Sequence, residues 1–147
     1  MDLDTTPMGC WLEDDQIARI RETIARIGPD AGWFAADVLH RLAATAPDTV
    51  GLLGETMGEQ RRSLVEALGW AGCLHDRSAF AAKFAAVAAA EPGSGPATRV
   101  EATFAALADA FAAWPGVDFD DDTRSAWHSL RTLSILLLEG QRARVAA

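Results

Sequence analysis

The stretch AFAAKFAAVAAAEPGSGPATRV, residues 79–100, decides how this chain is interpreted. Phe80, Phe84 and Val87 recur at steps of four and three residues, the spacing that places side chains on one face of an α-helix. The segment EPGSGP then has the composition of a loop, and a second helix is predicted from about Ala97. The whole stretch contains no His, Cys, Met or Tyr, which restricts the kind of site it can build.

Length and charge limit the class of protein. A chain of 147 residues, half of them apolar, is long enough for one domain with its own core. The net charge of −8 disfavours nucleic acid and anionic membranes as partners, because phosphate binding needs a concentrated basic face. No apolar run reaches the roughly 20 residues of a membrane span. The acidic start MDLDTTPMGC lacks the pattern of a signal peptide, so we expect a cytoplasmic protein.

The hydrophobic spacing is helical along nearly the whole chain. Ile17, Ile20, Ile24 and Ile27 form one apolar stripe that stops before Gly28. Similar stripes predict further helices around residues 33–42, 64–70, 80–87, 100–111 and 127–137, and residues 49–59 are expected to form a turn. No strand pattern competes. We therefore predict one all-α domain of about six to seven helices over residues 14–140, between tails at 1–13 and 141–147.

The order of several short motifs resembles that of a known family. They are Gly28–Pro29 after the first helix, Arg41–Leu42 and Ala46–Pro47 at the end of the second, Gly58–Glu59–Gln60–Arg61 at the start of the third, and Ala126–Trp127 in the last. In this order and spacing the chain resembles the globin domain of flavohaemoglobins and single-domain bacterial haemoglobins. The resemblance covers roughly residues 14–140 and implies a globin-like fold.

The resemblance also implies which residues line the former haem pocket. These are Leu39, Leu53, Gln60, Leu64, Phe84 and Val87. Leu39 falls where the family carries its distal Tyr, and Leu53 falls where a Phe wedges against the haem face. Gln60 and Leu64 match the distal Gln and the Leu beside it. The pocket is therefore expected to retain its apolar lining while losing groups that serve bound oxygen.

The family's iron ligand is missing from this sequence. In the family, the helix that ends within residues 79–100 supplies the proximal His, and the equivalent position falls near Ala90 and no further than Pro92. No His lies between His75 and His128, and no Cys, Met or Tyr in residues 79–100 can replace it. Ala97 also stands where the family carries a Tyr that orders the proximal side. We therefore expect no cofactor and no metal, with conventional haem binding lost.

The resulting functional prediction is a non-enzymatic sensor or interaction module, similar to the haem-free globin sensor domains of bacterial stress-response complexes. It would hold an apolar small molecule in the former haem pocket, with a second copy or another protein as partner. The alternative is a haem-binding globin that binds oxygen or nitric oxide through an unconventional axial ligand such as His40. A structural dimer through the last two helices is a third class. Catalysis ranks last, because no nucleophile and base lie at close spacing.

The other polar candidates are interpreted structurally. Asp120–Asp122 are expected to cap a helix, since they lack the alternating ligands of a calcium loop. Cys10 and Cys73 lack metal-ligand spacing and are expected as reduced thiols, and the three His residues as surface groups. The Phe and Trp residues are expected mainly in the core, with some lining a leftover cavity: Trp33, Phe34, Phe80, Phe84, Phe104, Phe111 and Trp127.

Overall fold

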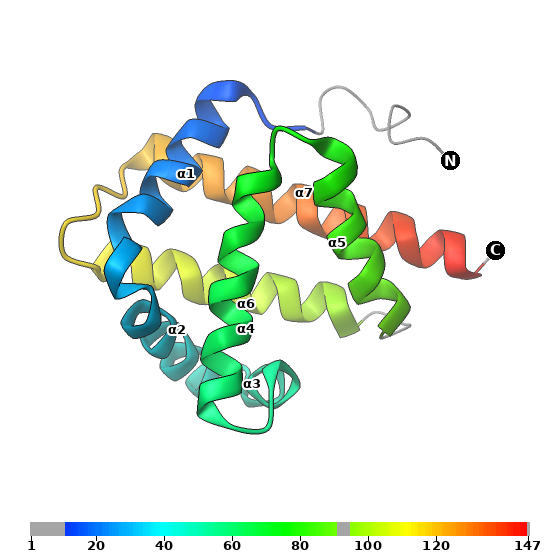
Figure 1. Cartoon of the computed structure of the whole chain (residues 1–147), viewed down its shortest axis with the longest axis horizontal. Coiled ribbons are helices and arrows are strands. Elements are labelled where there is room, and N and C mark those ends of the chain that lie inside the picture. Colours follow the sequence, from blue (N-terminus) through cyan, green and yellow to red (C-terminus); the bar gives the residue numbers. More distant parts are fainter. Residues whose placement is uncertain (1–10, 91–94, 147) are drawn as a thin grey trace.

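Seven α-helices and two short 3₁₀ turns make up the described part of the chain (Figure 1). The computed structural model describes residues 11–90 and 95–146. In chain order the elements are α1 (Asp14–Ile27), η3 (Gly28–Asp30), α2 (Ala31–Thr45), α3 (Pro47–Leu53), α4 (Met57–Gly69), η4 (Trp70–Cys73), α5 (Arg77–Ala90), α6 (Gly95–Ala113) and α7 (Asp121–Ala146). These residues contain no strand, so the all-α prediction is confirmed, and the arrangement is consistent with a globin-like fold.

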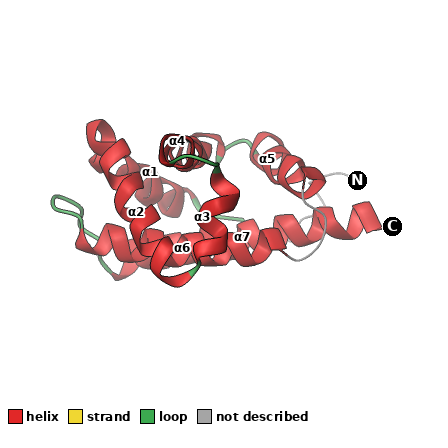
Figure 2. Cartoon of the chain, turned by 90° about the horizontal axis from the view of Figure 1, so that it is seen from below, coloured by secondary structure: helices red, strands yellow, loops and turns green. Residues whose placement is uncertain are grey.

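The last two helices form the base on which the others pack. α7 packs against α1, α5 and α6, while α2 packs against α4 and α6. Figure 2 shows α4 and α5 on one side of the base formed by α6 and α7. This arrangement leaves space between α4 and α5 on one side and α6 and α7 on the other, and the candidate site lies there.

The aromatic core joins α2 to the two base helices. Phe34 and Phe111 are both fully buried, and their ring centroids lie 4.5 Å apart. Phe111 also lies 4.8 Å from the Trp127 ring, and Phe34 meets Trp114 edge-on at 5.4 Å. Trp33 was expected in this core, but its side chain is 71% exposed. Adjacent residues on a helix point about 100° apart, so burying Phe34 turns Trp33 toward solvent.

A short helix occupies part of the segment that the sequence pattern predicts as a turn. α3 covers Pro47–Leu53, with Pro47 in its first turn, where the fixed φ of proline favours helix and its missing N–H costs nothing. The connection to α4 is tight: a Cβ at Gly54 would lie 2.7 Å from Cβ of Glu59. Only glycine allows this approach. Thr56 and Glu59 then cap α4 reciprocally, since each side chain accepts a hydrogen bond from the other's backbone N–H.

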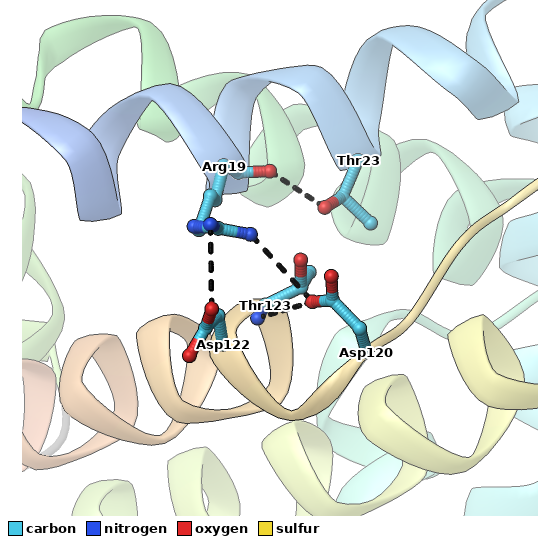
Figure 3. Close-up of polar contacts among 5 residues, drawn as sticks. All are labelled: Arg19, Thr23, Asp120, Asp122 and Thr123. Atoms are coloured by element: carbon cyan, nitrogen blue, oxygen red, sulfur yellow. Dashed lines mark hydrogen bonds and ion pairs between the residues drawn. The ribbon is translucent and has the colours of Figure 1, made fainter.

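The start of α7 is tied to α1 by a cluster of polar groups (Figure 3). The backbone N–H of Thr123 donates to Oδ1 of Asp120 at 2.8 Å, so Asp120 caps the helix as the sequence predicts. Arg19 on α1 lies 3.6 Å from Asp120 and 3.5 Å from Asp122. The hydrogen bonds from Thr123, together with the charge of Arg19, hold the pKa of Asp120 below its ordinary value.

Both ends of the domain extend beyond the predicted boundaries. Trp11 and Leu12 are buried, and the Trp11 Nε1 donates to the carbonyl oxygen of Leu74 at 3.2 Å. α7 runs on to Ala146, because residues 141–146 are rich in helix-forming Ala and Arg and contain neither Gly nor Pro. Residues 1–10, which include Cys10, lie outside the described residues. Within the described ranges, no helix has the length and apolar character required to span a membrane.

Replacing Asp120 tests the link at the start of α7. Asp120→Ala should lower the thermal unfolding temperature at pH 7, measured by far-UV circular dichroism, because the cap and the Arg19 ion pair are lost. Because the pKa of Asp120 is lower in the folded than in the unfolded protein, its carboxylate stabilises the fold at pH values above the unfolded-state pKa of about 3.9. This stabilisation is lost as the pH falls through the folded-state pKa. The difference from the parent protein should therefore shrink as the pH falls below about 3.9. A difference independent of pH would contradict the role of the carboxylate, and Asp120→Asn, which keeps the acceptor, should show a smaller loss at pH 7.

Trp33 and Phe34 provide a matched test of the aromatic core. Phe34→Ala should lower the free energy of unfolding by about 3–5 kcal/mol, because it leaves a cavity beside Phe111 and Trp114. Trp33→Ala, one residue away on the same helix, should change it by less than about 0.5 kcal/mol. Urea unfolding of the two variants checks both values. Comparable losses in the two variants would contradict the orientation of α2.

Candidate functional site

A cavity of about 370 Å³ lies between the base helices and the helices above them. Its walls come from α3, α4, η4, α5, α6 and α7. The apolar lining residues are Leu52, Leu53, Leu64, Ala67, Leu68, Trp70, Ala71, Phe80, Phe84, Val87, Val100, Phe104, Leu107, Trp127 and Leu130, and the polar ones are Thr49, Ser63, Glu66, Arg99, Thr103 and Ser134. This size and composition are those of a small-molecule site.

The sequence of α5 explains why one wall is apolar and thin. Phe80, Phe84 and Val87 share one face of α5, and all three line the cavity. Between them the helix is almost entirely alanine, and Ala81 is buried. Small side chains allow α5 to pack closely on α7 but provide little volume with which to fill the space beside α4. The cavity is therefore a consequence of the residue sizes in α5.

Aromatic rings cluster along the same wall. The Trp70 ring meets Phe84 edge-on with centroids 5.4 Å apart, and Phe84 lies 5.2 Å from Phe80. Across the cavity, Phe104 and Trp127 lie 6.2 Å apart. Ring pairs at these separations stabilise each other and restrict the side chains to a few orientations. The wall is thus largely pre-formed.

Two of the polar lining groups are engaged with the backbone. The Ser63 hydroxyl donates to the carbonyl oxygen of Leu53 at 2.8 Å, and the Ser134 hydroxyl donates to that of Leu130 at 2.8 Å. Glu66 is exposed, whereas Arg99 is half-buried and its Nε atom is buried. Leu52 also lines the cavity and is 55% exposed, which shows that the cavity reaches the surface near α3 and α4.

The structure brings together most of the residues predicted for the former haem pocket. Leu53, Leu64, Phe84 and Val87 all line the cavity. Leu39 and Gln60 do not. Leu39 is buried within the core on α2, and Gln60 turns its side chain back to the corner before α4, where Nε2 donates to the carbonyl oxygen of Gly54 at 3.1 Å. That hydrogen bond holds the Gln60 amide at the corner.

The described lining does not fit a haem iron bonded to the protein. His40, His75 and His128 are all exposed, and none of them lines the cavity. The described lining residues include no His, Cys, Met or Tyr that could serve as an axial ligand. The Ala90 side chain and Pro92, between which the resemblance places the proximal position, lie outside the described side chains. Cys73 is a free, half-buried thiol in η4 and is not part of the lining.

For other lining residues the sequence pattern gives little or no indication of a place in the site. Trp70 fits the apolar stripe of α4, but the chain tightens into η4 there, and the altered turn directs its ring to Phe84. Arg99 and Thr103 lie one turn apart on α6. This spacing places two residues on one face of a helix, but it does not distinguish a face that lines a cavity from a face exposed to solvent. Ser134 is buried within an apolar stretch of α7. A polar residue on the apolar face of this helix is the one feature of the sequence that could indicate its place in the site.

No family model matches this chain, and no curated protein matches it.

Filling the cavity should stabilise the fold. Ala67→Leu places added methyl groups in the space between α4 and the base helices, and we expect a gain of about 0.5–2 kcal/mol in the free energy of unfolding. Ala105→Leu, at an exposed position on α6, is the control and should change the free energy by less than about 0.5 kcal/mol. Urea unfolding measures both. A loss of more than 1 kcal/mol in Ala67→Leu, by the order of magnitude of overpacking penalties, would show that the space cannot accept a larger side chain.

Proposed function

We propose that this chain is a globin-like, non-enzymatic sensor or interaction module that binds an apolar small molecule in the cavity. One observation carries the proposal: four of the six residues that the globin resemblance assigns to the haem pocket line a largely apolar cavity, and the described walls of that cavity offer iron no ligand. A cavity at this place, without side chains that could bind a haem iron, favours an occupant other than haem. The globin relationship itself rests on the sequence motifs and is part of the proposal.

The energetics of the cavity support a bound ligand. Since Leu52 and Glu66 are exposed lining residues, the space communicates with the surface, and a ligand can enter without unfolding of the core. An apolar occupant would bury the exposed apolar lining and be stabilised by the same burial.

A module of this kind transmits binding to a partner. The partner we propose is a second copy or another cytoplasmic protein that contacts α6 or α7, because both helices line the cavity and also form the base of the domain. Leu136 on α7 is an exposed large apolar side chain on this base. The alternative function, oxygen or nitric oxide binding through haem held by His40, is less well supported, since His40 lies outside the cavity.

Binding of a neutral apolar dye tests the proposal. N-phenyl-1-naphthylamine should bind saturably with one site per chain, seen as a rise in its fluorescence. Ala67→Leu should weaken binding by about tenfold or more, because it removes space that the dye needs. Ala105→Leu should bind as the parent protein does. Absence of saturable binding, or equal weakening in both variants, would contradict a ligand site in this cavity.

A further inference from the structure

The cavity wall is unusually rich in aromatic rings from separate parts of the chain. The rings are Trp70 from η4, Phe80 and Phe84 from α5, Phe104 from α6, and Trp127 from α7. A core stripe on one helix would explain two of them. It does not explain why rings from four elements converge on the same space.

The lining rings are steeply inclined to one another rather than parallel. Trp70 and Phe84 stand at 82° to each other, Phe80 and Phe84 at 59°, and Phe104 and Trp127 at 53°. An aromatic ring carries negative charge density on its face and positive charge density on its edge. The edge of a bound aromatic ligand can therefore contact the face of one protein ring, while the face of the ligand contacts the edge of another protein ring. A saturated ring of the same size has no such complementarity.

The polar lining selects little else. The hydroxyls of Ser63 and Ser134 are already bonded to backbone carbonyl oxygens. Glu66 and Arg99 carry opposite charges, so the charged part of the lining does not favour one sign of ligand charge. The wall therefore offers a ligand mainly its aromatic rings, and among these the Trp127 Nε1–H is buried without a hydrogen-bond partner in the described part of the chain.

We infer that the natural ligand class of this cavity is a compact molecule built on an aromatic ring system. This inference rests on the proposed function, because it requires that the cavity bind a small molecule. It adds the property by which the ligand is selected: ring-to-ring complementarity in addition to hydrophobic burial.

A matched pair of ligands tests the inference. 2-Naphthaleneethanol and its fully saturated decahydro counterpart have the same carbon skeleton and the same neutral hydroxyl group. The saturated compound is the more hydrophobic, so burial alone favours it. Ring complementarity should instead make the aromatic compound bind about 3- to 10-fold more tightly, measured by isothermal titration calorimetry. Equal or tighter binding of the saturated compound would overturn the inference.

Two tryptophan variants provide the internal control. Trp70→Leu removes a cavity ring and should lower the aromatic-to-saturated affinity ratio at least about twofold. Trp114→Leu removes a half-buried ring that packs on Phe34 outside the cavity, and it should leave the ratio unchanged. An equal fall of the ratio in both variants would contradict a specific role for the wall. If both compounds bind without preference, only this inference fails, whereas if neither binds, the proposed function fails with it.

Discussion

The packing of Phe111 determines how the rest of this domain is arranged. Its fully buried ring lies 4.5 Å from Phe34, 4.8 Å from Trp127 and 5.8 Å from Phe119. Three helices and the connector before α7 therefore meet at one side chain, and the packing of α2 on α6 follows from it. Trp127 belongs to this cluster and also lines the cavity, so the cavity begins where the aromatic core ends.

The cavity follows from an imbalance of side-chain sizes. The α2 side of the domain is filled by large rings, whereas α5 contributes two Phe residues and a Val set among alanines. Close packing of α5 on α7 satisfies the local contacts without filling the space beside α4. Larger side chains at a few positions would fill this space, since Ala67 and Ala71 both line it. The small side chains at these two positions leave space for an occupant.

The sequence pattern predicts most of the fold but only part of the site. Regular apolar spacing identifies the helices, and Gly28–Pro29 marks the boundary between α1 and α2. The pattern misses α3, because the few residues around Gly51 have the composition of a turn. It also does not determine whether the Trp33 side chain points into the core or into solvent. In the site, Leu64 and Phe84 are predictable from motif order. Gln60 is not, because a hydrogen bond to Gly54, formed only at the folded corner, determines where its amide lies.

The proposed function requires that the cavity bind an occupant other than haem. Titration of the purified protein with haem, followed by visible absorption, tests it. We predict no saturable shift of the Soret band beyond that given by a protein known not to bind haem, because the described cavity walls offer iron no axial ligand. A stoichiometric, saturable shift would contradict the account, and loss of that shift on replacing His40 with Ala would identify the ligand.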